Sequence, residues 1–259
     1  MPTHIAIAGI LGRMGQEITV AGHSVEGVQI VAGVVRPGAL ARLNGGRPDV
    51  PLVEHVEEIL PAVDVLVDFT SPEATVAHAR ACAGANTPFV SGVTGLSANQ
   101  SEALRDVAAV VPVFHARNMS VGLNALLGIL PGLIRALDGY DVEIVETHHR
   151  HKADAPSGTA LALAEAILSA RGANLAERAI YGRQGVAPRT SGELGIHAVR
   201  AGGNSGEHVI LLADEGEEIR VAHRAYSRRT FAMGALRAAR FVAGRPPGLY
   251  AMADLTTVP

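Results

Sequence analysis

One short segment of this 259-residue chain concentrates side chains that can transfer protons or carry positive charge. From Glu146 to Ala160 the sequence reads ETHHRHKADAPSGTA, and the five positions from His148 to Lys152 carry three imidazoles, a guanidinium and an ammonium. The chain as a whole has a net charge of −3, so this cluster is a local excess of positive charge. Like charges held together repel one another unless an anion offsets them, and the segment therefore predicts an anionic partner.

The residues on either side predict how this segment is positioned. The apolar alternation of Val142–Val145 indicates a strand before it. Ser157 or Thr159 can cap a helix that begins near Ala160. A loop that ends at a helix N-terminus offers free N–H groups to a carboxylate. We therefore expect a proton-donating, carboxylate-binding site here, with a solvated basic loop as the simpler alternative.

A second motif lies near the N-terminus, where an apolar strand, a glycine-rich turn and a helix follow one another. The strand is expected over 4–9, the turn reads GILGRMG, and the helix continues from Gln16. Glycines let the backbone approach a pyrophosphate, and the helix N-terminus binds it. The spacing is GxxGxxG, because Leu11 stands where the usual middle glycine would be. The strand–turn–helix context favours a dinucleotide site over a plain tight turn.

Composition narrows the class of protein. The chain is 48% hydrophobic and slightly acidic, with 3% aromatic residues and no Trp, which argues against a nucleic-acid surface. Cys82 is the only cysteine, and we expect a small core residue in a reducing compartment. The apolar run 119–137 contains Asn124 and Pro131, so a buried interdomain helix is expected there instead of a membrane span. No secretory signal is evident, and we expect a soluble, cytoplasmic protein.

The order of the remaining elements predicts an α/β fold with two domains. In the first half, apolar strands alternate with helical stretches, which indicates a Rossmann-like, doubly wound parallel sheet. The expected strands are 28–34, 63–70, 88–92 and 111–115, with helices over 72–83 and 97–109. Ligands in such sheets bind beyond the carboxyl ends of the strands.

The second half has a different texture. Strand-like runs at 196–199, 208–213 and 218–222 follow one another as in hairpins, which predicts a mixed or antiparallel sheet in an α+β domain. A helical pattern returns over 230–243. We therefore expect a dinucleotide-binding domain of residues 1–120 and 230–259, and a substrate-binding and oligomerisation domain of residues 121–229.

With these motifs in this order, the chain resembles the 4-hydroxy-tetrahydrodipicolinate reductase (dihydrodipicolinate reductase) family of lysine and diaminopimelate biosynthesis. The resemblance runs nearly end to end. Its markers are the glycine-rich turn, the cationic segment, and the stretches Asp68–Thr70, Gly92–Gly95, Asn118–Gly122, Arg200–Gly202, Gly206–His208 and Gly248–Met252. It implies hydride transfer from NAD(P)H to C4 of a cyclic imine that bears two carboxylates.

The resemblance also implies roles for individual residues. His148 matches the proton donor or acceptor, Lys152 matches the proton donor, and no metal is implied. The substrate carboxylates would be held by His149, Gly158 and Thr159. The cofactor phosphates would lie on the glycine-rich turn, at Gly9, Ile10, Leu11, Gly12, Arg13 and Met14. The adenosine ribose would lie at Arg36. The nicotinamide would lie beside two strand ends, which hold Gly92, Val93 and Thr94 and Ala116, Arg117, Asn118 and Met119.

The family resemblance further implies an assembly. Its members are homotetramers in which the sheet of the second domain forms the subunit interface. Their C-terminal segment folds back onto the nucleotide domain, and residues 230–259 would do so here. The implied partner is a small dicarboxylate substrate, without nucleic acid or membrane.

Two positions depart from the family pattern, and one of them bears on cofactor choice. Val93 stands where the family often has Thr. Val35 replaces the acidic residue that usually accepts hydrogen bonds from the ribose 2′-OH of NADH. Arg36 remains and can pair with the 2′-phosphate of NADPH. We expect NADPH to be preferred and NADH to remain usable, unless an acidic residue from the Arg42–Asp49 loop restores NADH binding.

Two alternatives from other classes remain. A non-enzymatic NAD(P)-binding regulator would keep the glycine-rich turn but would have no reason to keep the cationic segment. A metal-dependent enzyme could use His148, His149 and His151. Adjacent histidines on a strand point to opposite faces, and no Cys or acidic partner has matching spacing, which disfavours the metal enzyme.

Overall fold

A computed structural model describes residues 1–43 and 48–256, and these form two compact units, each described here by itself. Unit 1 comprises Met1–Val121 and the C-terminal segment from Arg228, and unit 2 comprises Gly122–Ser227. Among the described residues, no helix is both long enough and apolar enough to cross a membrane. The elements of unit 1 are β1 (Thr3–Ala8), α1 (Arg13–Gly22), β2 (Val28–Val34), η1 (Leu40–Arg42), β3 (Leu52–Val53), η2 (Val56–Glu58), η3 (Leu60–Ala62), β4 (Val65–Asp68), α2 (Pro72–Gly84), β5 (Phe89–Ser91), α3 (Ala98–Ala108), β6 (Pro112–His115), α7 (Arg229–Val242), β12 (Gly248–Tyr250) and α8 (Met252–Thr256).

The sheet of unit 1 is parallel throughout, with the strand order β12-β6-β5-β4-β1-β2-β3. Successive side chains of a strand point to opposite faces, so each strand contributes to two cores. Ile5 and Ile7 of β1 pack with α1 and α7, whereas Ala6 and Ala8 pack with α2 and α3. Helices on both faces of a parallel sheet confirm the prediction of a Rossmann-like, doubly wound domain.

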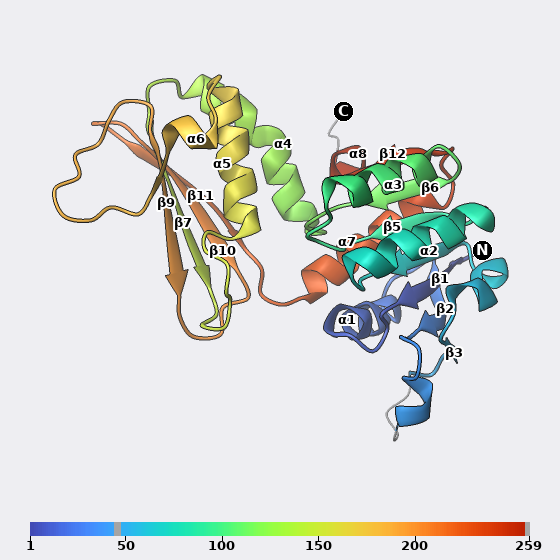
Figure 1. The fold of residues 1–259 in the computed structure, drawn as a ribbon. Helices are drawn as coiled ribbons and strands as arrows, with labels where there is room; N and C mark the ends of the chain where they lie inside the picture. Colours follow the sequence, from blue (N-terminus) through green and yellow to red (C-terminus); the bar gives the residue numbers. More distant parts are fainter. Residues whose placement is uncertain (44–47, 257–259) are drawn as a thin grey trace. The chain divides into compact units, whose positions relative to one another are not determined.

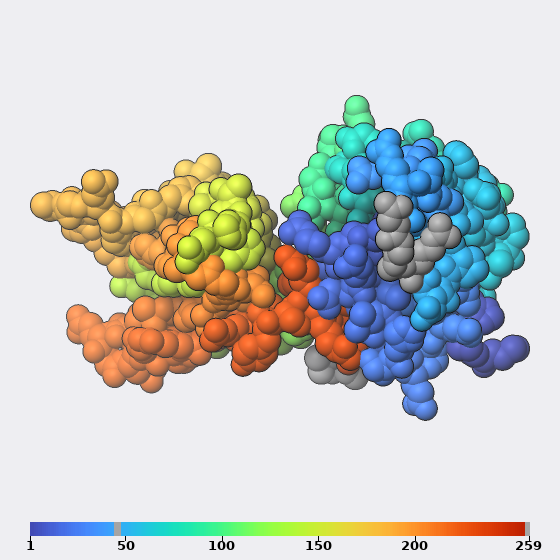
Figure 2. All heavy atoms as spheres, turned by 90° about the horizontal axis from the view of Figure 1, so that it is seen from below, coloured from blue at the N-terminus to red at the C-terminus, as the bar shows by residue number. Residues whose placement is uncertain are grey.

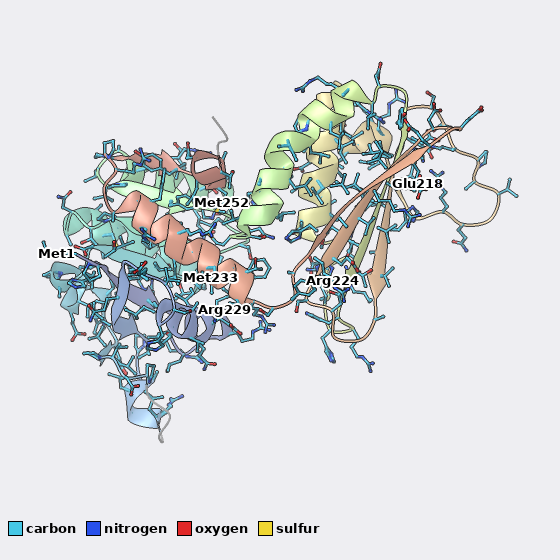
Figure 3. The ribbon with its side chains drawn as sticks, turned by 180° about the vertical axis from the view of Figure 1, so that it is seen from behind. Met1, Glu218, Arg224, Arg229, Met233 and Met252 are labelled. Atoms are coloured by element: carbon cyan, nitrogen blue, oxygen red, sulfur yellow. The ribbon has the colours of Figure 1, made fainter. Side chains whose placement is uncertain are left out.

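The C-terminal segment completes unit 1. Helix α7 packs against α1, and Figure 2 shows this orange-red segment beside the blue N-terminal residues. Met233 on α7 and Met252 at the start of α8 are labelled in Figure 3. Strand β12 adds to the edge of the sheet beside β6. Cys82 lies on the buried side of α2, as expected of a core residue, and burial raises the pKa of its thiol.

Unit 2 contains a five-stranded mixed sheet with the order β11-β10-β7-β9-β8. Helices cover one face of it (Figure 1). The prediction of a hairpin-like succession is wrong for one strand, because β9 runs parallel to β7 and is not paired with β10. Only β10 and β11 form the expected hairpin. The elements of unit 2 are α4 (Val121–Ala136), β7 (Asp141–His148), α5 (Gly158–Ala170), α6 (Leu175–Arg178), β8 (Ala179–Tyr181), β9 (Leu194–Arg200), β10 (Glu207–Ala213) and β11 (Glu218–Arg224).

Helix α4 lies where the sequence predicted a buried interdomain helix, and only one of its sides is buried. Leu123, Leu126, Leu130 and Ile134 recur every three or four residues and pack into the core of unit 2. Ile129 on the opposite side is 62% exposed. One side of the helix is therefore buried and the opposite side is exposed, although apolar residues lie almost all round it.

Candidate functional site

The alternation of β7 places two ionisable groups on its buried face. Val142 and Ile144 face the helices and pack into the core of unit 2. Glu146 and His148 continue the same face, and they are 0% and 8% exposed. A buried charge is costly unless it is paired and hydrogen-bonded, so this pair needs partners.

Glu146 has all the partners that a buried carboxylate requires. Its Oε2 lies 2.6 Å from Nδ1 of His148, and its Oε1 accepts a 2.9 Å hydrogen bond from the backbone N–H of Ser157. Arg200 donates to both oxygens, at 2.8 and 2.7 Å. The parallel register of β7 and β9 places Arg200 opposite His148, which brings the guanidinium within reach. Burial opposes ionisation of Glu146, but these donors outweigh it and hold its pKa below the ordinary value.

The surroundings of His148 define its protonation. Burial lowers the pKa of His148, and the hydrogen bond to Glu146 offsets this only in part. The ring is therefore neutral at neutral pH, and because the carboxylate of Glu146 can only accept, the ring proton lies on Nδ1. Nε2 is then the atom left for chemistry. A Cβ at Gly206, whose φ is +144°, would lie 2.9 Å from this Nε2, so the glycine keeps the nitrogen accessible.

A second buried imidazole packs behind the first. The rings of His148 and His208 meet edge to face at 5.2 Å between centroids. Nε2 of His208 lies 3.0 Å from Oγ of Ser157. Burial lowers the pKa of His208 to about 4, so this ring is also neutral.

The cationic segment has counterions within the chain. Nζ of Lys152 donates to both carboxylate oxygens of Asp154, at 2.8 and 2.9 Å. Glu146, which pairs with His148, supplies a second negative charge, so part of the anionic partner that the sequence predicts comes from the chain itself. Asp154 is largely exposed, so its pairing with Lys152 is weak and exchangeable.

The start of α5 adjoins this network, as the sequence predicts. Ser157 is the N-cap, and its Oγ accepts a 3.1 Å hydrogen bond from the N–H of Ala160. Gly158 and Thr159 form the first turn of α5. The backbone N–H of His149 donates to the carbonyl of Asn204 at 2.8 Å, which fixes the chain just after β7. The structure thus brings the predicted catalytic and substrate-binding residues into one region of unit 2.

Unit 1 contains a separate cavity of about 600 Å³ beyond the carboxyl ends of β1, β2 and β4. Four of the predicted cofactor-binding residues line it, namely Gly9, Leu11, Gly12 and Arg36. The other lining residues are Val34, Val35, Pro37, Ala39, Glu54, Phe69, Thr70, Ser71, Ala74 and His78. The volume and the adjoining helix start suit the adenosine half of a dinucleotide.

The glycine-rich turn is as tight as the motif requires. A Cβ at Gly15 would lie 2.3 Å from the carbonyl oxygen of Gly9, so only glycine fits where α1 crosses β1. Arg13 and Met14 form the first turn of α1, whose N-cap is Gly12. The side chain of Ile10 is fully buried, so Ile10 can offer a ligand only its backbone.

The remaining predicted cofactor residues lie elsewhere in unit 1. Gly92, Val93 and Thr94 follow β5, and Ala116 to Met119 follow β6, the next strand in the sheet. None of them lines the 600 Å³ cavity. The side chains of Val93 and Met119 are buried. Ala116 and Arg117 line a smaller cavity of about 250 Å³.

Several functional candidates were missed from the sequence. Glu146 could have been found, because the alternation of β7 places it on the apolar face together with His148. Asp154 could also have been found, because it lies two positions from Lys152 in the same segment. Arg200 and His208 lie 54 and 51 positions from their partners and carried no local signal of them. Glu54, which lines the cavity of unit 1, was missed because the short strand just before it was not recognised.

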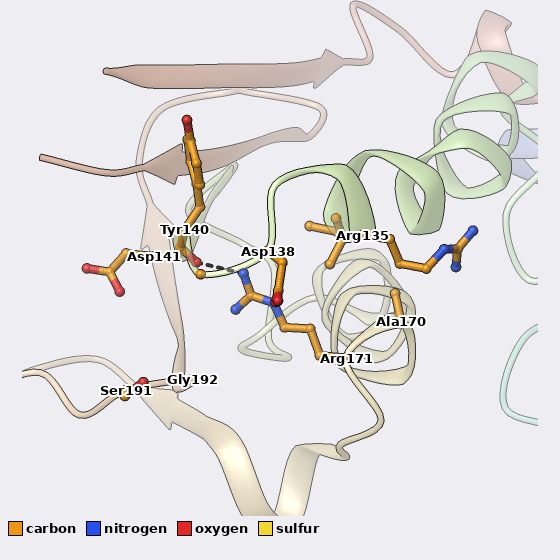
Figure 4. A pocket seen from close by; sticks show the side chains of 10 residues that line it. Arg135, Asp138, Tyr140, Asp141, Ala170, Arg171, Ser191 and Gly192 are labelled. Carbon is orange, nitrogen blue, oxygen red and sulfur yellow. Dashed lines mark hydrogen bonds between the residues drawn. The ribbon is translucent and has the colours of Figure 1, made fainter. Parts of the chain in front are cut away.

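Another cavity of unit 2, of about 480 Å³, lies at the far end of α5 (Figure 4). It is lined by Arg135, Asp138, Asp141 and Arg171, and Arg171 donates to the carbonyl of Tyr140 at 2.6 Å. The 13 residues of α5 separate it from Gly158 by roughly 18 Å. It is therefore distinct from the His148 region.

Comparison with known proteins gives a consistent family. Residues 3–119 match the model of the dihydrodipicolinate reductase N-terminus, and residues 122–256 match that of its C-terminus. Two curated relatives named 4-hydroxy-tetrahydrodipicolinate reductase are 50% identical (Rubrobacter xylanophilus, 97% of each chain) and 47% identical (Thermomicrobium roseum, 98% of this chain and 99% of the relative). A solved dipicolinate-bound dihydrodipicolinate reductase from a Paenisporosarcina species has a TM-score of 0.80 at 26% identity, covering 99% of this chain and 100% of that one.

More distant structures share the fold alone. An amine dehydrogenase from Mycobacterium smegmatis has a TM-score of 0.57 at 15% identity, over 97% of this chain and 95% of that one. The two family matches cover almost the whole chain, and the near relatives agree with them. This chain belongs to the dihydrodipicolinate reductase family.

Proposed function

We propose that this protein reduces 4-hydroxy-tetrahydrodipicolinate to tetrahydrodipicolinate with NAD(P)H, as a step of lysine and diaminopimelate biosynthesis. The names of its relatives support this reaction. The observation that carries it in the structure is the buried network of His148, Glu146 and Arg200 beside Lys152 and the start of α5. A nucleotide-binding regulator has no use for such a network, so we do not favour that alternative.

The cofactor, when bound, supplies the hydride, and the chain supplies its position and charge environment. The glycine-rich turn and the N-terminus of α1 would hold the pyrophosphate, because α1 begins just beyond the carboxyl end of β1 and a helix N-terminus favours an anion. Arg36 would pair with the 2′-phosphate of NADPH. The residues after β5 and β6 would flank the nicotinamide.

Two side chains would handle the proton that the reduced substrate takes up. Lys152 carries an ammonium and can donate a proton, and its partner Asp154 is exposed enough to release it. His148 is neutral and presents a bare Nε2, so it suits accepting a hydrogen bond or a proton. In this proposal Lys152 and His148 are the catalytic residues, while Glu146 and Arg200 are positioning residues that hold the tautomer of His148.

The substrate carboxylates would be bound by His149 and by the first N–H groups of α5 at Gly158 and Thr159. A helix N-terminus carries partial positive charge, which favours an anion. The solved relative contains dipicolinate, a planar dicarboxylate of this kind.

We also propose a homotetramer assembled through the open face of the sheet in unit 2. Helices cover the other face, and Val145 and Val199 on the uncovered side are exposed. Exposed apolar residues on a sheet face are typical of protein interfaces. A cytoplasmic location stays a prediction from the single cysteine.

The direct test mixes the purified protein with NADPH and 4-hydroxy-tetrahydrodipicolinate, the product of the preceding synthase step. Loss of reduced-nicotinamide absorbance that depends on both compounds supports the proposed reaction. Oxidation of NADPH without 4-hydroxy-tetrahydrodipicolinate, or none with it, would contradict it.

A second test addresses the carboxylate site. Pyridine-2,6-dicarboxylate should compete with the substrate, and its inhibition should weaken as salt concentration rises, because ions screen the attraction between its carboxylates and the cationic segment. Pyridine-2-carboxylate, with one carboxylate, is the matched control and should inhibit less. Equal inhibition by both compounds would remove the support for a two-carboxylate site.

A further inference from the structure

The cavity of unit 1 contains a carboxylate that the sequence pattern does not indicate. Val35, at the position where an acid would bind the ribose of NADH, is only 5% exposed and packs into the core. The N–H of Val35 donates to the carbonyl of Val53 on the neighbouring strand at 2.9 Å. Glu54 is the next residue, and it lines the same cavity as Val35 and Arg36.

The carboxylate of Glu54 is held in place. Its Oε1 accepts a 3.0 Å hydrogen bond from the backbone N–H of Leu40, in the loop that follows Arg36. Hydrogen bonds from the backbone N–H groups of Gly38 and Leu40 keep the pKa of Glu54 below its ordinary value. The group is therefore ionised at neutral pH, and the loop cannot move away from β3 without losing these bonds.

One cavity thus contains a fixed negative charge and a positive charge. The carboxylate of Glu54 can accept hydrogen bonds from ribose hydroxyls, whereas it repels a 2′-phosphate. The guanidinium of Arg36 does the reverse, because it attracts the phosphate as a charged, forked donor. Both side chains line the cavity, so each can act on a ligand bound there.

We propose that Glu54, which directly follows the strand beside β2, replaces the missing carboxylate at Val35 and determines how well NADH competes with NADPH. The inference rests on the proposed use of NAD(P)H and adds a specificity-determining residue to it. The sequence had raised the competing possibility that an acidic residue from the Arg42–Asp49 loop restores NADH binding. Glu54 lies outside that loop, and residues 44–47 of the loop lie outside the described residues.

The test measures the dissociation constants of NADPH and NADH by titration calorimetry, without substrate. The Glu54→Gln variant keeps an oxygen that can accept from Leu40 and removes the charge. We expect its preference for NADPH over NADH to rise about threefold to tenfold relative to the unaltered protein, mainly through tighter NADPH binding. Glu54→Asp keeps the charge and should change the preference less.

Glu57→Gln is the matched control, because Glu57 is exposed, carries the same charge and does not line the cavity. It should leave the preference unchanged. If Glu54→Gln leaves the preference within that of the control, or if both nucleotides weaken in parallel, Glu54 has no role in specificity. If the unaltered protein binds neither nucleotide, the proposed cofactor fails, and the inference fails with it.

Discussion

Charged side chains are buried and paired in one functional region of this chain, whereas in the other they face a cavity. In unit 2, Glu146 is fully buried and satisfied by His148, Arg200 and Ser157 before any ligand arrives. In unit 1, Arg36 is exposed and Glu54 is half-buried, and both face a cavity. A proton-transfer group must have a defined protonation state, which burial provides. A cofactor site must stay accessible to the cofactor, so its charged side chains remain near water and affect the affinity for NADPH and NADH.

The largest effect is expected in the proton-handling region. Replacing Lys152 with Ala should lower kcat about 10²- to 10⁴-fold, because a positioned acid is lost. NADPH affinity and the circular dichroism spectrum should be unchanged, since the side chain of Lys152 bonds to no described residue other than exposed Asp154. Near-normal turnover of the variant would show that Lys152 is not the proton donor.

A smaller loss of kcat is expected when Glu146, the hydrogen-bond partner of His148, is replaced. Glu146→Gln should lower kcat by about 10²-fold, because the amide no longer requires the proton of His148 to sit on Nδ1. The carboxylate of Glu146 raises the pKa of His148, so the variant should shift the pH profile of kcat toward lower pH. A lower kcat with an unshifted profile would point to a purely structural role.

The third prediction concerns stability in acid. The pKa of His208 is about 4 in the folded protein and 6.5 as a free side chain, so the unfolded chain binds more protons between these values. This contribution is fully present above pH 6.5 and is lost as pH falls toward 4. The free energy of unfolding should therefore drop by about 2 kcal/mol between about pH 6.5 and 5, as measured by urea denaturation. His148, His223, Glu146 and Lys152 surround this ring.

The control for that measurement uses two histidines. His208→Asn should flatten the pH dependence in this window, and His151→Asn, at an exposed position, should not. Glu146 and Glu193 contribute to the pH dependence of stability outside this window. The pKa of Glu146 is lowered and that of Glu193 is about 2, so their contributions change at more acidic pH. An unchanged slope in His208→Asn would assign the loss to other groups.

The smallest effect is expected in the cofactor cavity. Val35→Glu should move the kcat/KM ratio toward NADH by about tenfold, since it adds an acceptor for the ribose 2′-OH. Val35 packs into the core, so the variant should also lose stability. The unaltered protein should prefer NADPH, and a clear preference for NADH would contradict the interpretation of Val35 and Arg36.

Local patterns were enough to predict most of the fold. The alternation of strands and helices predicted the doubly wound sheet, because each strand of a parallel sheet is a short apolar run that needs no distant information. The glycine spacing likewise predicted a turn after β1, where Gly9 and Gly12 precede α1, whereas Gly15 lies inside the helix.

The charge network could not be predicted in the same way. Arg200 reaches Glu146 only because β9 runs parallel to β7, and the two residues are 54 positions apart. The sequence suggested hairpins instead, since consecutive strands are most often antiparallel neighbours. Glu54 escaped notice because a two-residue strand leaves no periodic pattern.

The glycine just before β10, Gly206, has a consequence for chemical labelling and inhibitor design. Glu146 blocks Nδ1 of His148, whereas Gly206 leaves the space beside Nε2 without a side chain. An acylating reagent small enough to enter should therefore modify this ring at one nitrogen, and a warhead aimed at His148 has one direction of approach. Any side chain at position 206 would close that approach.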